Sequence, residues 1–327
     1  MGVTRDPFLA MDVVLLFPGQ GSQKPGMGKD LAAAFPAAAE VFEQADAALG
    51  EPLSAVCFEG PADTLTLTHN AQPALLAHGA AVWAVARDAL GDSVRAAAGH
   101  SLGEFTAYCA AGSIGLPDAI RLVRRRGTLM YESGLARPGT MAAILGDTDR
   151  PIDDICTEAS SSPEGGLVVP ANYNAPGQVV ISGEVAGVER AMELSRQAGA
   201  KRAIRLPVSG AFHSPLMQPA RDPFARALAD ASLSDPTVPV YANVNAEPVT
   251  RAGEARQLLL DQLTAPVRWT QLVERLVRDF SGALLVEMGP GSVLTGLVKK
   301  IAPAVECVAC GAPADMDSLL TRAVRAA

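Results

Sequence analysis

Short apolar runs alternate with longer helical stretches along the first part of the chain. Residues 13–17 read Val-Val-Leu-Leu-Phe, an uninterrupted apolar run typical of a buried parallel strand. The pattern then predicts two helices, a second short strand and two further helices, at 31–49, 73–90, 93–99, 104–111 and 117–132. Strands that alternate with helices in this way indicate a parallel α/β sheet.

Near residue 139 the pattern changes. It now predicts strand, helix, strand, strand, helix and strand, at 140–145, 151–159, 167–173, 178–182, 185–198 and 202–208. This βαββαβ order is that of the ferredoxin-like unit. The α/β pattern resumes afterwards with a strand, two helices and a strand, at 239–243, 252–264, 270–278 and 283–287.

The fold class expected from these patterns is α/β, with two domains. Residues 11–136 and 209–327 are predicted to form a large discontinuous domain with a parallel-sheet, hydrolase-like core. Residues 137–208 are predicted to form a small ferredoxin-like domain inserted into it, and residues 1–10 a flexible N-terminus. A cleft between two such domains is a usual place for a binding site.

Composition narrows the class of protein. The chain has 327 residues, 49% of them hydrophobic and 19% charged, which is typical of soluble globular proteins. Its net charge of −8 argues against a nucleic-acid partner. No apolar run reaches the roughly 18 residues of a membrane span, and residues 1–10 lack the apolar segment of a secretory signal. We therefore expect no membrane association.

Cysteine usage points to a reducing compartment. The five cysteines are scattered and odd in number, which favours reduced thiols in the cytoplasm. Cys307 and Cys310 form an isolated CxxC without a second pair or a nearby histidine. We expect them to lie in a late strand at 304–310, and we expect no metal site.

The candidate chemistry begins at Gly99-His100-Ser101-Leu102-Gly103. A serine flanked at this spacing by glycines is the pattern of a nucleophile elbow, in which a strand turns sharply into a helix. The turn exposes Ser101 Oγ and directs the first N–H groups of the helix at any charge forming beside it. The pattern alone is common, so the remainder of the chain has to support it.

A nucleophilic serine needs a base. Of the four histidines, His69 and His78 belong to or precede an Ala- and Leu-rich helix and favour structural roles. His100 is next to the serine in sequence, but the turn directs its side chain elsewhere, so we expect packing. His213 lies in a Gly- and Pro-bounded loop, and from the residues alone a role as base and a structural role stay equally open.

Seven short segments, in the order in which they follow along the chain, together resemble those of a known family. The chain resembles malonyl-CoA:acyl carrier protein transacylases and the related acyltransferase domains of fatty-acid and polyketide synthases, from about Val13 to Ala302. The segments are Phe17-Pro18-Gly19-Gln20-Gly21-Ser22-Gln23, Asn70-Ala71-Gln72-Pro73-Ala74, Gly99-His100-Ser101-Leu102-Gly103-Glu104, Arg126-Gly127-x-x-Met130, Asn172-Tyr173-Asn174-Ala175-Pro176-Gly177-Gln178, Gly210-Ala211-Phe212-His213-Ser214 and Glu287-x-Gly289-Pro290.

The resemblance implies catalytic roles. Ser101 takes the acyl group, and His213 accepts its proton and returns one to the leaving thiol. No carboxylate is evident as a third member; the resemblance implies that the backbone carbonyl of Gln262 orients the histidine. The backbone N–H groups of Leu102 and Gln20 are the implied oxyanion donors.

The resemblance also implies a substrate. Arg126 matches the position that grips the free carboxylate of malonyl, which a guanidinium can do with two hydrogen bonds. Phe212 resembles the malonyl-selecting form of its segment, where methylmalonyl-selecting relatives carry a smaller residue. Polar residues at matched positions are expected to line the pocket, with ordinary loop hydrogen bonding as an equal alternative: Gln72, Asn172 and Asn174.

The implied function is transfer of malonyl from malonyl-CoA, through acyl-Ser101, to the phosphopantetheine thiol of an acyl carrier protein. It serves fatty-acid or polyketide biosynthesis. No bound cofactor is expected, because CoA arrives as a thioester substrate and the partner carries the phosphopantetheine. Neither the dinucleotide-binding fingerprint nor the P-loop motif is complete in the chain. The acidic carrier protein is expected to be attracted by the arginine-rich helix at 121–126 or by Lys299 and Lys300.

Three other functions remain open from the sequence. The first is a free-standing polyketide-synthase acyltransferase with another extender unit. The second is an acyl-thioester hydrolase of the same fold, although an α/β-hydrolase proper shows Ser, then Asp or Glu, then His, and gives Arg126 no role. The third is a carrier-binding module without catalysis, in which malonyl-CoA leaves Ser101 unlabelled.

Overall fold

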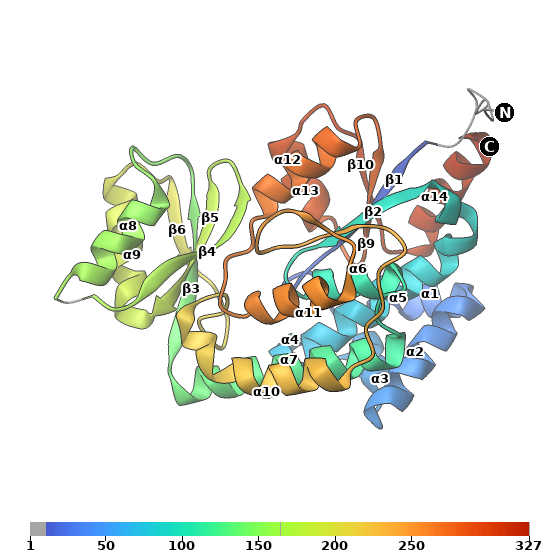
Figure 1. Ribbon diagram of the computed structural model, residues 1–327, viewed down its shortest axis with the longest axis horizontal. Helices are drawn as coiled ribbons and strands as arrows, with labels where there is room; N and C mark the ends of the chain where they lie inside the picture. The colour runs from blue at the N-terminus through green and yellow to red at the C-terminus, as the bar shows by residue number, and fades with distance from the viewer. Residues whose placement is uncertain (1–10, 164, 327) are drawn as a thin grey trace.

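The computed structural model describes residues 11–163 and 165–326 and contains two separate sheets (Figure 1). The larger sheet has six strands in the order β10-β9-β1-β2-β7-β8, parallel throughout except for the antiparallel pair β7 and β8. Its strands are β1 (Val13–Phe17), β2 (Val94–Gly99), β7 (Val240–Tyr241), β8 (Pro248–Val249), β9 (Leu284–Met288) and β10 (Cys307–Cys310). The predicted α/β class with a parallel sheet is confirmed.

Helices cover both faces of this sheet, because β1 is apolar on both sides. Val13, Leu15 and Phe17 belong to one hydrophobic cluster, and Val14 and Leu16 to another. The first cluster includes residues of α2, α5, α6 and α7, and the second residues of α12 and α13. The helices are α1 (Lys29–Ala34), α2 (Pro36–Leu49), α3 (Leu53–Glu59), α4 (Ala62–Thr66), α5 (Thr68–Leu90), α6 (Leu102–Ala110), α7 (Leu116–Ala136), α10 (Gln218–Asp230), α11 (Ala252–Asp261), α12 (Trp269–Asp279), α13 (Val293–Ile301) and α14 (Pro313–Ala326).

The smaller sheet lies beside the large one, on the left in Figure 1. Its strands are antiparallel, in the order β4-β5-β3-β6, and it has its own hydrophobic cluster beneath α8 and α9. This is the ferredoxin-like order predicted for the region. The elements are β3 (Gly139–Leu145), α8 (Ile152–Ser161), β4 (Val168–Ala175), β5 (Gln178–Glu184), α9 (Val185–Gln197) and β6 (Arg202–Arg205).

Backbone hydrogen bonds tie the small sheet to the large part of the molecule. The N–H of Tyr173 donates to the carbonyl of Val267 at 2.9 Å, and the N–H of Val267 donates to the carbonyl of Ala171 at 2.8 Å. Strand β4 is therefore joined to the segment before α12. The domain limits at 137 and 208 stay a prediction, and the flexible N-terminus expected at 1–10 lies outside the described residues.

Several predicted elements differ from the observed ones. The helix predicted at 31–49 is two helices, because Phe35 is extended (φ −129°, ψ 115°) and Pro36 begins α2. The strand predicted at 202–208 ends at Arg205, and that at 239–243 is reduced to Val240–Tyr241. Helices α3, α4, α10, α13 and α14 were not predicted from the pattern.

Three further observations concern the sequence expectations. Within the described residues, no helix is both long enough and apolar enough to cross a membrane. Cys307 and Cys310 begin and end β10, so the CxxC lies in a strand as predicted. The described part of the chain holds no group of three or more metal-ligating side chains.

Candidate active site

The turn between β2 and α6 is sharp and strained. Ser101 stands between them with φ 51° and ψ −106°, a conformation that costs a non-glycine residue energy and occurs at functional sites. The turn also requires glycine on both sides: a Cβ on Gly99 would lie 1.9 Å from the carbonyl carbon of Gly103, and one on Gly103 would lie 2.0 Å from the carbonyl oxygen of Phe17. This geometry is that of a nucleophile elbow.

His213 lies directly against the serine. Its Nε2 is 2.8 Å from Ser101 Oγ, and its Nδ1 is 2.9 Å from the carbonyl oxygen of Gln262. A carbonyl can only accept, so the proton is on Nδ1 and Nε2 is free to take the proton of the hydroxyl. Burial, together with the Arg126 guanidinium, lowers the pKa of His213 to about 3. The imidazole is therefore neutral and able to act as a base.

Arg126 brings a buried positive charge to the serine. It comes from α7, is 1% exposed, and its Nη2 lies 3.1 Å from Ser101 Oγ. Nη1 donates to Gln72 Oε1 at 2.7 Å and Nη2 to Gln262 Oε1 at 2.8 Å. Burial lowers its pKa to about 10, so it remains a cation at neutral pH. Its Nε is buried and has no hydrogen-bond partner among the described residues.

Two residues that sequence reasoning missed support the turn from beneath. Asn243 Oδ1 accepts from the N–H of Ser101 at 2.7 Å, and its Nδ2 donates to the carbonyl of Gly99 at 2.7 Å. Glu104 is fully buried and accepts from Gln262 Nε2 at 2.6 Å. Glu104 ends the segment Gly99–Glu104 that contains the serine, and Asn243 ends the strand predicted at 239–243. Only the fold shows that they meet.

A cavity of about 400 Å³ opens over the serine, between the end of β2 and the small sheet. Five of the residues predicted as site residues besides Ser101, Arg126 and His213 line it: Gln20, Gln72, Leu102, Asn172 and Phe212. Apolar residues make up much of the rest of the wall, namely Met130, Met141, Leu206, Pro207 and Val208, and polar groups are added by Gln23, Thr66 and His100. The cavity therefore combines one buried cation with a mixed lining that is mainly apolar.

One predicted lining residue lies elsewhere. Asn174 does not line the cavity; its Oδ1 is 2.8 Å from Nε2 of His100. Asn174 lies in β4, and its contact with His100 is the ordinary hydrogen bonding that the sequence left open as the alternative. His100 also packs against Trp269, with ring centroids 5.5 Å apart. His78 is buried, and its Nε2 lies 2.9 Å from the carbonyl of Gly311.

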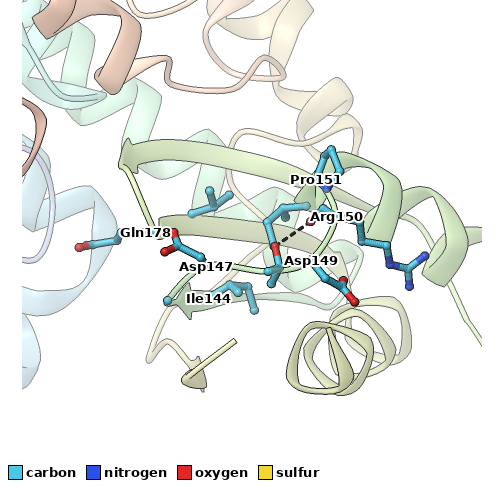
Figure 2. Close-up of a pocket in the computed structure, with 11 residues that line it drawn as sticks. Ile144, Asp147, Asp149, Arg150, Pro151 and Gln178 are labelled. Carbon is cyan, nitrogen blue, oxygen red and sulfur yellow. Dashed lines mark hydrogen bonds between the residues drawn. The ribbon is translucent and has the colours of Figure 1, made fainter. Parts of the chain in front are cut away.

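A second hollow, of about 380 Å³, lies on the small sheet around the β3–α8 loop (Figure 2). Its polar residues include Asp147, Asp149, Arg150 and Gln178, and Thr148 Oγ1 donates to the carbonyl of Arg150 at 2.7 Å. Among the residues that the structure describes, those lining this hollow include no serine, histidine or cysteine. The candidate chemistry therefore belongs to the cavity over Ser101.

A strained serine paired with a neutral histidine, on a parallel α/β sheet, is the arrangement of enzymes that carry an acyl group on serine. The chain matches the family model described as "Acyl transferase domain" over residues 14–311, and it belongs to that family.

Within this family, the chain is similar to malonyl CoA-acyl carrier protein transacylases. It is 44% identical over 305 residues to the one from Bacillus subtilis (strain 168), covering 93% of this chain and 95% of that protein. The acyl-carrier-protein-S-malonyltransferase of Bartonella henselae matches with a TM-score of 0.90 and 43% identity, over 96% of this chain and 100% of that one. A malonyl-transacylase in complex with its type II PKS acyl-carrier protein matches with a TM-score of 0.89 and 42% identity, over 95% and 99%.

Proposed function

We propose that this chain is a malonyl-CoA:acyl carrier protein S-malonyltransferase, working by a ping-pong mechanism through malonyl-Ser101. The observation that carries the proposal is the buried guanidinium of Arg126, 3.1 Å from the candidate nucleophile in an otherwise largely apolar cavity. A cation in that place favours an acyl group that ends in a carboxylate. The names of the relatives support the same substrate and partner.

The first half-reaction loads the serine. Ser101 Oγ attacks the thioester carbonyl of malonyl-CoA while its proton passes to Nε2 of His213. The N–H groups of Leu102, the first residue of α6, and of Gln20 are our candidates for donors to the oxyanion. When the intermediate collapses, the C–S bond breaks and the proton on His213 goes to the departing sulfur. The products are malonyl-Ser101 and CoA thiol.

The second half-reaction reverses these roles. The phosphopantetheine thiol of the carrier protein gives its proton to His213 and attacks the ester carbonyl. The C–O bond to Ser101 breaks, and His213 returns the proton to Oγ. The carbonyl of Gln262 keeps Nδ1 protonated throughout, because its hydrogen bond to Nδ1 is independent of the reacting side of the ring.

Substrate choice is assigned to the residues around the acyl group. The malonyl carboxylate is held by Arg126, whose orientation is fixed by Gln72 and Gln262. Phe212 limits the space beside the α-carbon, which favours malonyl over branched extender units. Asn172 adds a polar group to the same wall.

The reaction needs no resident cofactor, because CoA enters as a substrate thioester and the carrier brings its own phosphopantetheine. We assign the protein to the cytoplasm, since all five cysteines are free thiols, and to fatty-acid or polyketide biosynthesis. We further propose residues 11–136 and 209–327 as the catalytic domain and 137–208 as the inserted small domain.

The test is competitive loading of Ser101. Malonyl-, methylmalonyl- and acetyl-CoA are offered together, and the adduct is identified by intact-protein mass spectrometry, with Ser101→Ala as the matched control. We expect a malonyl adduct on the wild-type protein and none on the control, and rapid discharge when carrier protein is added. Preferential loading of another acyl group would identify a different extender unit. Faster discharge to water than to carrier would identify a hydrolase, and an unlabelled serine a non-catalytic module.

A further inference from the structure

Glu104 is a buried carboxylate that the transfer reaction described above does not use. It lies in the first turn of α6, three residues after the nucleophile, and is 0% exposed. It does not line the cavity, so it touches no substrate. A charge buried so completely requires a partner or a role.

The hydrogen bonds of Glu104 lead to Arg126 through one side chain. Its Oε2 accepts from Gln262 Nε2 at 2.6 Å and from the N–H of Asn243 at 3.1 Å. An ionised carboxylate can only accept, so it fixes the amide of Gln262 with Nε2 inward. Gln262 Oε1 then faces Arg126 Nη2 at 2.8 Å. Glu104 thereby sets which end of the amide meets the guanidinium.

The same pair balances charge in the empty site. The positive charge of Arg126 on α7 lowers the pKa of Glu104, and the negative charge of Glu104 raises the pKa of Arg126. The other groups facing Glu104 are neutral: the side chain of Gln262, the backbone N–H of Asn243 and the hydroxyl of Tyr108 on the same helix. Burial raises the pKa of the Tyr108 hydroxyl well above its usual value, so it stays protonated. Glu254 on α11 acts on that hydroxyl.

We propose that Glu104 is a positioning residue and the resting counter-charge of Arg126, and that it takes up a proton when the substrate carboxylate occupies the guanidinium. The proposal rests on malonyl being the acyl group. Two buried carboxylates then compete for one cation, and the one that can be neutralised gives way. The proton has a place, since Oε1 has no partner among the described residues while Oε2 keeps both hydrogen bonds.

The direction of the titration agrees with this role. Burial raises the pKa of Glu104 to about 7 in the resting site, against the lowering effect of Gln262, Asn243 and Arg126. A malonyl carboxylate on Arg126 adds negative charge and raises that pKa further. Substrate binding near neutral pH therefore takes up a proton, and the affinity for malonyl-CoA falls as pH rises through about 7.

The experiment measures binding without chemistry. Ser101→Ala protein is titrated with malonyl-CoA by calorimetry in two buffers of different ionisation enthalpy, and Kd is followed from about pH 6 to pH 8.5. Acetyl-CoA, which carries the same phosphates but no carboxylate, is the matched ligand control. We expect proton uptake with malonyl-CoA only, and a Kd for malonyl-CoA that rises by about fivefold across this range while that for acetyl-CoA stays flat.

The double variant Ser101→Ala/Glu104→Gln removes the titrating group and keeps an oxygen to accept both hydrogen bonds. We expect it to bind malonyl-CoA without proton uptake and with a flat pH dependence. Equal proton uptake by the single and the double variant would overturn the inference. So would the absence of proton uptake by the single variant Ser101→Ala, and that result does not depend on whether the double variant folds. If malonyl-CoA bound no better than acetyl-CoA at any pH, the proposed function itself would fall together with it.

Discussion

At the scale of single residues, Arg126 carries substrate choice. We expect Arg126→Ala to lower kcat/KM for malonyl loading of Ser101 by at least about a hundredfold, because a buried partner of the carboxylate is lost. Loading from acetyl-CoA should be retained or increased. Stopped-flow loading rates with both thioesters measure the ratio. Arg125→Ala is the control, since Arg125 is the exposed neighbour on the same helix. An equal fall for both acyl groups would show that Arg126 supports the serine rather than the carboxylate.

The protonation state of His213 gives a second prediction. Only the neutral imidazole can take the serine proton, and the pKa of His213 is lowered to about 3. Loading from acetyl-CoA should therefore stay constant as pH falls from about 7.5 to about 5. A histidine with the ordinary pKa of 6.5 would lose roughly thirtyfold over this range. Pre-steady-state loading rates across the range decide between the two. Acetyl-CoA avoids the change in Glu104 protonation that binding of a malonyl carboxylate is expected to cause, and Glu104→Gln protein removes the titration that Glu104 shows in the resting site.

Single residues also show how much of the candidate site could be predicted from the sequence. The glycine pattern around Ser101 indicates a nucleophile, whereas the roles of His213 and Arg126 followed from the family resemblance. The structure places His213 and Arg126 within hydrogen-bonding distance of Ser101 Oγ. Asn243 and Glu104 could not be predicted as parts of the site. Their contact joins positions 139 residues apart, and it depends on β7 pairing beside β2.

At the scale of elements, the close approach of α6 to β1 holds the turn in place. We expect Gly103→Ala to reduce the free energy of unfolding by at least about 2 kcal/mol, because the new Cβ would lie 2.0 Å from the carbonyl oxygen of Phe17. Gly253→Ala is the matched control: it lies on α11 with no atom near its Cβ position, and should change stability by less than about 1 kcal/mol. Chemical denaturation measures both, and similar values for the two would contradict the packing argument.

The pattern predicted those elements whose packing in the fold matches the preference of their own residues. Strand β1 matches its predicted limits because it is apolar on both faces. Helix α10 was missed because Pro223 lies inside it and interrupts its helical pattern. Its buried residues Phe224 and Leu228 join the main core, and that packing outweighs the local preference against helix.

At the scale of the whole molecule, the site depends on both sheets. Ser101 follows β2 of the large sheet, whereas Met141 and Asn172 come from β3 and β4 of the small one. The sequence predicted two domains and a cleft, but the residues of the small sheet that form the wall followed only from the resemblance or, for Met141, from the fold. The position of α13 against β4 was likewise visible only in the structure.

That position selects between the two predicted docking surfaces for an acidic carrier. On α7, Arg121 pairs with Asp118 and Arg124 with Glu51, so much of its charge is already balanced. Lys299 and Lys300 are exposed in the last turn of α13. Lys300 Nζ contacts Gln178 Oε1 at 2.8 Å, at the junction with the small sheet. The structure therefore favours α13.

We expect the charge reversal Lys299→Glu/Lys300→Glu to raise KM for the carrier protein by about tenfold and to weaken its salt dependence, because complementary charge steers association. Loading of Ser101 from malonyl-CoA should be unchanged, which separates carrier docking from recognition of CoA. Arg87→Glu/Arg226→Glu, two exposed reversals on α5 and α10, controls for net charge, because it also lowers the net charge of −8 by four. Steady-state transfer to carrier at two salt concentrations gives both quantities. If KM responded equally to both variants, the attraction would come from overall charge, and α13 would lose its role as the docking surface.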